Sequence, residues 1–413
     1  MRSKWYIARK IGFGRGGGFT RFMLSLATVS VALSIAIMVL ANAVTNGFQN
    51  QITQKIYDFW GHIHISSGYT NKFFETEPIQ LEPELVRKIE NLDLTSQGAT
   101  GPVRSVNGII QYPVILQHDG VLEGSITRSL DTNFRYDIMD RYIVEGSLDS
   151  FRWEDRSLIL SRSIQHKIDA KVGDRIILYF MRDEQQFPRR FRITGIYNTG
   201  VMEYDEKVIF VRTEDVRGIL GFEPGTFTSY EISLASNDDI DLYNDYLYQN
   251  VIPSDLFNFS IEELFPNIFD WVRMQATNEK LIMVLLLIVS VINMITVFFI
   301  LVMEKVRVIG LFKALGSLDR DIRHIFILLA GRILFFGILI GNGVALGLGY
   351  LQQKLHLVAL DESEYYISHV PIEFNFGFIL LINVIVLIVC SIFMFLPAIV
   401  ISGIRPSKTL RFA

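Results

Sequence analysis

Four long stretches of the chain lack charged residues, and this feature most limits what the chain can fold into. No Asp, Glu, Lys or Arg lies between Arg21 and Lys55, Lys280 and Glu304, Arg332 and Lys354, or Glu373 and Arg405. A helix needs about 20 apolar residues to cross the hydrocarbon core of a bilayer. We therefore expect four transmembrane helices, at 22–47, 279–303, 325–352 and 375–402.

A cleaved signal peptide is the alternative interpretation of the first uncharged stretch. Its apolar part is longer than the apolar region of a signal peptide, and no small-residue cleavage site precedes a polar segment. We therefore favour a membrane span. The single cysteine, Cys390, excludes an intrachain disulfide framework and lies within the fourth stretch, where it is most simply a small apolar residue.

Charge is divided unevenly between the spans and the segment that separates the first two. Residues 49–278 contain 22 basic and 35 acidic residues, a net charge of −13, whereas the rest of the chain has 17 basic and 8 acidic residues, a net charge of +9. The chain as a whole carries only −4, with no basic excess of the kind that nucleic-acid binding requires. The pattern predicts a membrane protein with one large water-soluble insertion.

The basic residues of the short segments predict the orientation. Six lie before the first span, five between spans 2 and 3, and three after span 4, whereas the loop between spans 3 and 4 has one against four acidic residues. Cytoplasmic segments carry the excess of Lys and Arg. We therefore place segment 1–21 (a partly amphipathic segment), loop 304–324 and tail 403–413 in the cytoplasm, and 48–278 and loop 353–374 outside.

The predicted fold is an α-helical membrane protein with four transmembrane helices and a large extracytoplasmic α+β domain inserted between helices 1 and 2. Apolar residues at helical spacing continue past span 1 and precede span 2, which predicts that both helices extend as stalks into the domain. Between the stalks, patterns typical of short strands alternate with short helices, and 118–200 is the candidate inserted subdomain. One predicted strand, Gly108–Gln117, contains Pro113, which suggests an edge or a bulge, and Thr213 is the expected cap of a helix to Leu220.

Polar residues inside the spans have two interpretations. Arg332 is either an intramembrane site or, as we favour, a side chain that reaches the headgroups. Asn42, Asn293, Asn342 and Asn383 fall one per span, as expected of hydrogen bonds between helices, although Asn42 and Asn293 could also face a substrate. Gly337/Gly341 and Gly343/Gly347 are spaced for close helix packing, which we expect within the chain rather than at a dimer seam.

No pattern of catalytic residues is present. The sequence has no phosphate-binding loop, and the glycines of 12–18 follow no strand, so they are interpreted as a joint before span 1. His62 and His64 could share one face of a strand, but two histidines without a third ligand are a weak metal signal. We therefore expect no enzyme, no metal and no cofactor on this chain.

Two segments carry a resemblance to a known family. The loop Glu304–Phe326 resembles the loop signature of the FtsX/MacB superfamily of ABC-transporter permeases, and the tail Pro397–Arg411 resembles that superfamily's ending. Within the superfamily the chain is most similar to the lipoprotein-releasing permeases of the LolC/LolE type, through Asn46-Gly47-Phe48 and Val172-Gly173-Asp174 among others. The resemblance implies a bacterial inner-membrane subunit that works with separate ATPase subunits, which use ATP, and with a second permease copy or paralogue.

The resemblance also implies three groups of functional residues. Contact with the ATPase is expected at the turn between spans 2 and 3, at Lys313, Gly316, Ser317, Asp319, Arg320 and Arg323. Gly316 is expected to end one helix, and Ser317 or Asp319 to cap the next. A periplasmic lipoprotein carrier is expected to dock on a projecting loop at Gln185, Gln186, Phe187, Arg189 and Arg190. Substrate lipid is expected to contact Val44, Phe48, Met283, Leu287, Met294 and Phe298, for which helix packing is the competing interpretation.

Two other functions remain open at this point. An efflux permease of the MacB type would push peptides or drugs through an outer-membrane duct, and a regulator of the FtsX type would activate cell-wall hydrolases without transport. The insertion of about 230 residues is larger than expected for such a regulator. Release of lipoproteins to a carrier is the function that the sequence favours.

Overall fold

The computed structural model describes residues 18–68, 77–131, 134, 136–182, 185–361 and 367–394. Their contacts divide into two compact units. A helical unit is formed by residues 18–50, 271–359 and 369–394, and an outer unit by 51–270 together with the described residues of 360–368. Segment 1–17 and the tail beyond Met394 lie outside the described residues, so the predicted amphipathic segment and the family-like ending are not covered.

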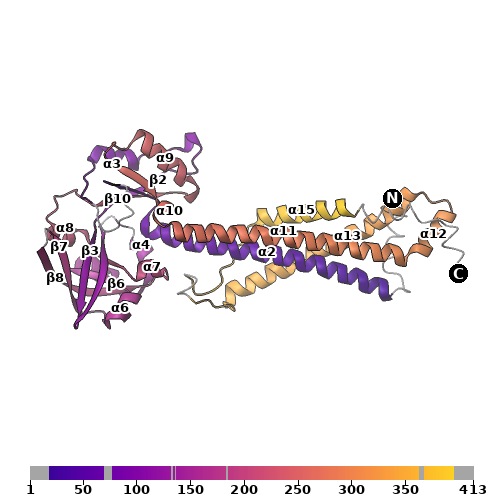
Figure 1. The fold of residues 1–413 in the computed structure, drawn as a ribbon, viewed down its shortest axis with the longest axis horizontal. Coiled ribbons are helices and arrows are strands. Elements are labelled where there is room, and N and C mark those ends of the chain that lie inside the picture. Colours follow the sequence, from indigo (N-terminus) through magenta and orange to yellow (C-terminus); the bar gives the residue numbers. More distant parts are fainter. Residues whose placement is uncertain are drawn as a thin grey trace. The chain divides into compact units, whose positions relative to one another are not determined.

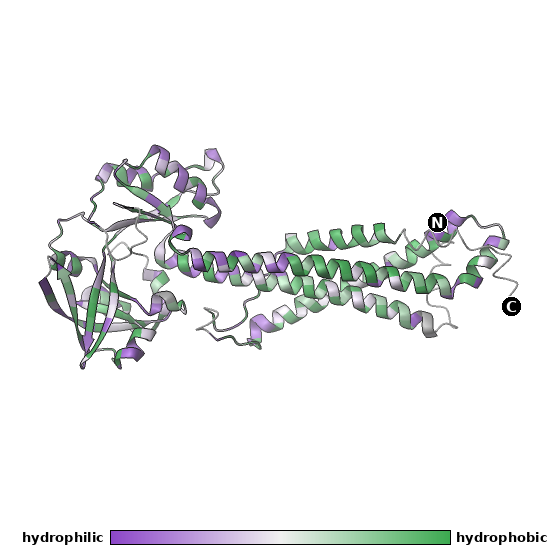
Figure 2. Ribbon diagram, viewed as in Figure 1, coloured by the Kyte–Doolittle hydropathy of each residue, from purple (hydrophilic) through white to green (hydrophobic). Residues whose placement is uncertain are grey.

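Four long helices of the described residues are apolar and long enough to cross a membrane. They are α2 (Gly18–Trp60), α11 (Pro266–Glu304), α13 (Asp319–Leu355) and α15 (Phe376–Phe393) (Figure 1). The first three predicted spans lie on α2, α11 and α13, and α15 covers the described part of the fourth, whose residues 395–402 lie outside the described residues. Figure 2 shows the hydrophobic character of these helices. A shorter helix, α12 (Val306–Ala314), lies between α11 and α13. The helical extensions predicted beyond spans 1 and 2 are confirmed, because α2 continues to Trp60 and α11 begins at Pro266.

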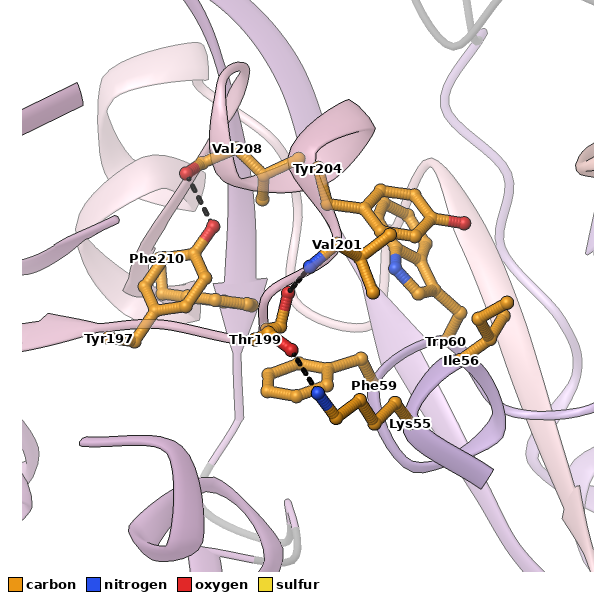
Figure 3. Close-up of a pocket in the computed structure, with 10 residues that line it drawn as sticks. All are labelled: Lys55, Ile56, Phe59, Trp60, Tyr197, Thr199, Val201, Tyr204, Val208 and Phe210. Carbon is orange, nitrogen blue, oxygen red and sulfur yellow. Dashed lines mark hydrogen bonds between the residues drawn. The ribbon is translucent and has the colours of Figure 1, made fainter. Parts of the chain in front are cut away.

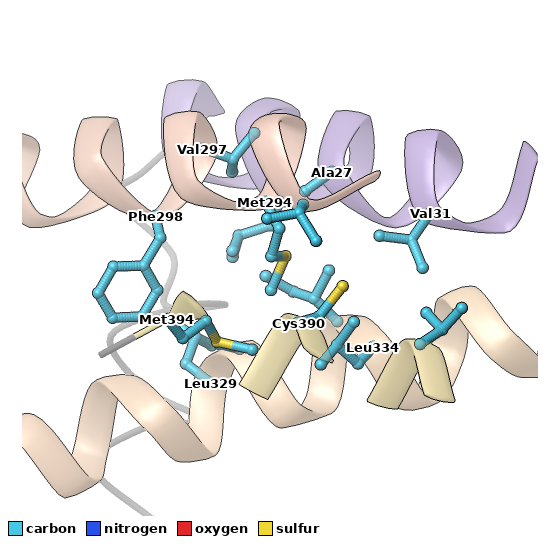
Figure 4. Close-up of a cluster of buried hydrophobic side chains, with 14 of the residues drawn as sticks. Ala27, Val31, Met294, Val297, Phe298, Leu329, Leu334, Cys390 and Met394 are labelled. Carbon is cyan, nitrogen blue, oxygen red and sulfur yellow. The ribbon is translucent and has the colours of Figure 1, made fainter. Parts of the chain in front are cut away.

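All four long helices contribute to one apolar core, part of which is drawn in Figure 4. Val31 of α2, Met294 of α11, Leu334 of α13 and Cys390 of α15 are all buried there. Leucines and isoleucines on the outer faces of α11, α13 and α15 remain exposed, as in helices surrounded by lipid. The thiol of Cys390 is therefore a packing group, as expected from the sequence.

The amide side chains of the spans bond neighbouring helices together. The Nδ2 of Asn42 donates to Oε1 of Glu279 (2.8 Å), and that of Asn293 donates to Oγ of Ser30 (2.7 Å); both bonds join α2 to α11. Asn342 and Asn383 exchange bonds of 3.0 and 3.3 Å between α13 and α15. The predicted role between helices is confirmed, and both candidate substrate-facing amides are engaged within the bundle.

Within the part of the chain that the structure describes, one of the two glycine pairs of α13 packs closely against another helix. A Cβ atom on Gly341 would lie 2.6 Å from the carbonyl oxygen of Ala32 and 3.0 Å from Cβ of Ile35, both on α2. Gly337 is equally close to Val31. Among the described residues, no atom lies within 4 Å of such a Cβ on Gly343 or Gly347. Close approach of α2 and α13 therefore depends on the first pair, and close packing within the chain stays a prediction for the second pair.

A matched pair of alanine substitutions tests this asymmetry. We expect Gly341→Ala to lower the free energy of unfolding by about 1–3 kcal/mol, because the added methyl group overpacks the helix contact. Gly347→Ala removes a helix glycine without a clash and should leave the bundle unchanged or more stable by up to about 1 kcal/mol. Reversible unfolding of the purified protein in mixed micelles measures both. Equal effects of the two variants would contradict the packing described here.

The outer unit contains two sheets. The smaller is antiparallel, in the order β11-β1-β10-β2. Its strands are β1 (Ile63–Ser66), β2 (Val103–Ile109), β10 (Ser229–Leu234) and β11 (Phe257–Ser260). Helix α3 (Pro83–Glu90) contacts β2, and α9 (Ile240–Asn250) contacts β11. The short helix α10 (Ile261–Leu264) follows β11 and begins with a capping box formed by Ser260 and Glu263.

The larger sheet has the order β5-β8-β6-β9-β4-β3-β7, and an additional pairing of β7 with β8 closes six of its strands into a barrel. Its strands are β3 (Gln111–His118), β4 (Val121–Leu130), β5 (Ile143–Gly146), β6 (Ser157–Ser161), β7 (Arg175–Arg182), β8 (Gln185–Tyr197) and β9 (Val208–Arg212). Helices α4 (Tyr136–Met139), α5 (Leu148–Trp153), α6 (Arg162–Ile168), α7 (Met202–Asp205) and α8 (Thr213–Leu220) accompany it. The inserted sheet thus spans 111–212, wider than the predicted 118–200.

Three local predictions differ from the structure. The predicted strand Gly108–Gln117 is two strands in different sheets, because the chain crosses from β2 to β3 at Ile110. Strand β3 is not an edge, but Pro113 lies just before the first residue paired with β7, Val114, where its missing N–H is tolerated. Thr213 does not cap α8: the N-cap is Arg212, and the Thr213 hydroxyl donates to Oγ of Ser129 (3.1 Å).

Candidate coupling, docking and substrate-contact sites

The turn between α12 and α13 has a defined geometry. Gly316 has a φ of +88°, which an L-residue with a side chain rarely adopts. The N–H of Ser317 donates to the carbonyl of Phe312 (2.9 Å) and that of Gly316 to the carbonyl of Lys313 (3.0 Å), the two bonds of a Schellman motif. The prediction that Gly316 ends a helix is confirmed.

The predicted cap of the next helix is wrong. The N-cap of α13 is Leu318, and neither Ser317 nor Asp319 caps the helix through its side chain. Asp319 instead forms an ion pair with Lys313, whose Nζ lies 2.9 Å from Oδ1 of Asp319. The pair joins α12 to α13 across the turn. Arg320 is exposed and Arg323 half-buried on the first two turns of α13. The ion pair fixes the angle at which α13 leaves the turn, so two of the predicted coupling residues maintain the shape of the turn.

Sequence reasoning missed the apolar part of this turn. Leu315 is 74% exposed and Leu318 is 69% exposed, on either side of Gly316, and Leu311 of α12 is also exposed. Exposed apolar side chains grouped on a surface and rimmed by polar residues mark interaction sites. The signal in the sequence is the two leucines that flank the turn glycine, Leu315 and Leu318.

The predicted substrate-contact residues fall into two groups. Val44 and Phe48 of α2 and Met283 and Leu287 of α11 are half-buried. Met294 and Phe298 are 2% and 4% exposed, respectively, in the core between α11 and α13 (Figure 4). These two could touch a substrate only after the helices separate, and a role in substrate contact stays a prediction for all six.

The predicted projecting loop is a β-hairpin. Gln185, Gln186, Phe187, Arg189 and Arg190 lie in β8 and pair with β7, from Arg182 opposite Gln185 to Ile177 opposite Arg190. The prediction of a loop is wrong, since these residues form a strand. Five of the six residues 185–190 are polar or proline, so the alternation of apolar and polar residues that is typical of a strand is not visible there. Phe187 packs against the barrel core, 5.2 Å below the guanidinium of Arg182, whereas Gln185, Gln186 and Arg190 are exposed. Docking of a carrier at this hairpin stays a prediction, and only the exposed side chains could take part in it.

A buried ion pair joins the two sheets at the end of α2. The guanidinium of Arg128 (β4) donates to both carboxylate oxygens of Glu231 (β10), at 2.6 Å for Nη2, and also to the carbonyl of Phe59. It lies 4.4 Å from the ring centroid of Trp60. The two side chains are 1% and 4% exposed. Burial raises the pKa of Glu231, and the adjacent Arg128 opposes this. One cation therefore holds α2, the barrel and the small sheet together.

The same end of α2 is fixed by a second contact. Lys55 Nζ donates to the carbonyl of Thr199 (2.7 Å), and the Thr199 hydroxyl accepts from the N–H of Val201 (3.0 Å) (Figure 3). The cavity beside these residues measures about 10 Å³, enough for about one water molecule. It is therefore no ligand site, and the surrounding side chains serve to attach α2 to the barrel.

The two histidines are part of the core rather than of a metal site. Nδ1 of His62 accepts from the N–H of Leu234 (3.2 Å) and Nε2 lies 3.0 Å from Oδ1 of Asn237, so the neutral ring fits both partners. Burial lowers the pKa of His62 to about 4 and that of His64 to about 3. No group of three metal-ligating side chains occurs among the residues that the structure describes.

The buried state of His62 predicts a loss of stability in acid. Its folded pKa of about 4 lies below the unfolded value of 6.5. Its contribution is therefore complete above pH 6.5 and is lost as the pH falls to about 4, up to about 3 kcal/mol. We expect His62→Gln, which keeps an acceptor and a donor, to reduce the loss of stability between pH 7 and pH 4.5. Part of the loss remains because His64 titrates in the same direction.

Thermal unfolding at a series of pH values measures this effect. His166→Gln, at an exposed position of α6, is the control and should leave the slope of stability against pH unchanged. The same slope in wild-type protein and in His62→Gln would contradict the assignment.

Comparison with known proteins finds two family models that match this chain. Residues 24–247 match the MacB-like periplasmic core domain and residues 280–406 the FtsX-like permease C-terminal domain. A lipoprotein-releasing system transmembrane protein LolC of Xylella fastidiosa is 20% identical over 96% of both chains, and a LolE of Haemophilus influenzae is 22% identical over 93% of both. The extracellular domain of the ABC-type transporter YknZ is similar over 48% of this chain, with 12% identity and a TM-score of 0.31.

The first family model alone covers more than half of the chain, and the second covers most of the helical unit. The family consists of permease components of ABC transporters in the bacterial inner membrane, which use ATP through a partner ATPase and are not enzymes themselves. The chain belongs to the FtsX- and MacB-like ABC-transporter permeases.

Proposed function

We propose that this permease releases lipoproteins from the inner membrane to a periplasmic carrier, driven by ATPase subunits bound on the cytoplasmic side. The observation that carries the proposal is similarity to LolC and LolE proteins along nearly the whole length of both chains. In this arrangement both termini and the α12–α13 turn are cytoplasmic, and the outer unit is periplasmic. The permease acts together with a second copy of itself or a paralogue.

The substrate explains why ATP is needed. Each buried CH₂ group of an acyl chain contributes roughly 0.8 kcal/mol to membrane anchoring. Two or three long chains therefore hold a lipoprotein by several tens of kcal/mol, and spontaneous escape is extremely slow.

Helices α2 and α11 contribute residues to both units, and their half-buried Val44, Phe48, Met283 and Leu287 are candidates to hold the acyl chains. Rearrangement of the two helices would move the chains out of the bilayer. Bonds from Lys55 and to the carbonyl of Phe59 attach the last turns of α2 to the outer unit's sheets.

Reconstitution tests the transport step. Proteoliposomes that contain the permease, its ATPase and an acylated lipoprotein are given a soluble carrier, and lipoprotein in the supernatant is measured with and without ATP. ATP-dependent transfer to the carrier is the expected result. ATP turnover without any transfer would count against lipoprotein release.

Photo-crosslinking identifies the periplasmic partner. A photoreactive residue at Gln186, exposed on β8, is compared with one at Leu122, which is exposed near the β3–β4 turn of the same barrel. A lipoprotein carrier captured at Gln186 and not at Leu122 supports the proposal. Capture of a membrane-fusion adaptor would indicate MacB-like efflux, and capture of a cell-wall hydrolase would indicate FtsX-like regulation.

A further inference from the structure

A groove between α2 and α13 combines an apolar wall with two cationic side chains. Its volume is about 370 Å³, within the range of small-molecule sites. Arg21 of α2 and Arg332 of α13 line it together with the hydroxyl residues Ser25 and Thr28. The remaining lining is apolar: Leu24, Val29, Leu329, Ile333, Phe336 and Ile340. Neither arginine belongs to the coupling, docking or substrate-contact sites described above.

The depth of the groove follows from helix geometry. Arg332 and Lys354 are 22 positions apart on α13 with no charge between them. At 1.5 Å per residue this distance is about 33 Å, close to the roughly 30 Å hydrocarbon core of a bilayer. The uncharged stretch between them is thus long enough to cross the hydrocarbon core, and the Arg332 side chain lies within reach of the headgroups on the side where α13 begins. Arg21 lies at the same level because it lines the same groove.

The remaining groups define the chemistry of the occupant. The Arg332 guanidinium lies 5.5 Å from the ring centroid of Phe336, which directs it along the groove wall. Two guanidinium groups match the oxygens of a phosphate. The hydroxyls of Ser25 and Thr28 donate to the carbonyls of Phe22 and Leu24, so they offer only acceptor lone pairs to a ligand. A hydroxyl-bearing headgroup can donate to them, and exposed Val29 and Ile340 provide an apolar wall for an acyl chain.

We propose that this groove binds one anionic phospholipid of the inner leaflet, with its phosphate between Arg21 and Arg332 and an acyl chain along Val29, Phe336 and Ile340. The lipid bridges α2 and α13 at the end of the bundle where α2 begins. The proposal depends on the membrane placement of these helices and not on the identity of the transported substrate.

Native mass spectrometry of the purified full-length permease tests the site with two probes, phosphatidylglycerol and phosphatidylcholine. We expect a bound phosphatidylglycerol at a concentration at which phosphatidylcholine does not bind. Arg332→Gln and Arg21→Gln should each weaken phosphatidylglycerol binding by about tenfold, since each removes one charged donor to the phosphate. Lys354→Gln, which removes one charge at the other end of α13, is the matched control and should bind as wild type. Equal binding of the two lipids, or unchanged binding in Arg21→Gln/Arg332→Gln, would overturn the proposal.

Two further arms keep the test decisive. Arg332→Lys retains the positive charge but lacks the planar guanidinium group, so its affinity for phosphatidylglycerol should lie between those of wild type and Arg332→Gln. This variant also provides a test if Arg332→Gln folds poorly. Val29→Cys tests whether a second copy of the chain occupies the groove, because the native Cys390 is buried. A disulfide between two Val29→Cys chains in native membranes would assign the groove to protein contact and exclude the lipid.

Discussion

Replacing Arg128 with methionine is expected to lower the free energy of unfolding of the permease by about 3–5 kcal/mol. The substitution leaves Glu231 buried without its cation, and it also removes the donor to the Phe59 carbonyl and the cation beside Trp60. Burial already raises the pKa of Glu231, so the unpaired carboxyl would take up a proton and limit the loss. Thermal unfolding of the full-length protein in nanodiscs measures the change.

Two controls distinguish the buried pair from a general effect of lost charge. Arg162→Met breaks the ion pair with Glu145, whose side chains are 43% and 47% exposed, and it should change stability by less than about 1 kcal/mol. The double variant Arg128→Met/Glu231→Leu removes both buried charges and should recover much of the stability lost in the single variant. An Arg128→Met protein as stable as Arg162→Met would contradict a structural role for the pair.

The Arg128 variant also separates anchoring of α2 from folding. The carbonyl of Phe59 belongs to the last turn of α2, so the double variant keeps two well-packed sheets but lacks the bond from Arg128 to the helix. If α2 transmits motion to the outer unit, the double variant should fold and bind the ATPase but release substrate more slowly. Full release by a stable double variant would show that the remaining contacts, such as Lys55 to Thr199, are sufficient.

The membrane part of the fold could be predicted from the sequence because its signal is local. An uncharged stretch of more than 20 residues has essentially one solution in a bilayer, a helix, and all four helices lie where those stretches fall. The asparagines of the spans were predictable for the same reason, because an amide in hydrocarbon needs a partner. Gly316 was predictable because a positive φ at the end of a helix favours glycine.

The outer unit was less predictable because its defining contacts are distant in sequence. Closure of the barrel depends on the pairing of β7 with β8, and the polar residues in the first half of β8 hid it. The ion pair of Arg128 and Glu231 joins residues 103 positions apart. Each residue appears as an isolated charge in a strand, and only the packing of one sheet against the other shows that both charges are buried.

The second large effect is expected at the turn between α12 and α13. If this turn docks into a groove of the ATPase, its exposed Leu315 and Leu318 are the side chains with the most apolar area to bury. Truncation of a central apolar anchor typically costs about 2 kcal/mol or more of binding free energy, which corresponds to about 30-fold. We expect Leu318→Asp and Leu315→Asp each to weaken ATPase association by at least about 30-fold and to abolish stimulated ATP turnover.

Charge reversal at Asp319 gives a less direct test, because Asp319 is paired with Lys313 and its loss also loosens the turn. The exchange Lys313→Asp/Asp319→Lys restores the pair with opposite polarity and should retain the shape of the turn. If ATPase binding returns in the exchange variant, the pair acts through the shape of the turn. If binding stays lost, at least one of these charges contacts the ATPase directly, as the family resemblance implies.

Leu357→Asp is the matched control for the leucine variants. Leu357 is 66% exposed and lies just after the C-terminal end of α13, whereas Leu318 precedes its N-terminal end. Leu357→Asp therefore makes the same leucine-to-aspartate change at the opposite face of the membrane. Co-purification and ATP turnover in nanodiscs, with a melting curve for each variant, separate docking from folding. Loss of the ATPase in Leu318→Asp but not in Leu357→Asp would place the interface at the turn. Equal binding by both variants, with unchanged turnover, would remove the turn from the interface and leave it a connection between two spans.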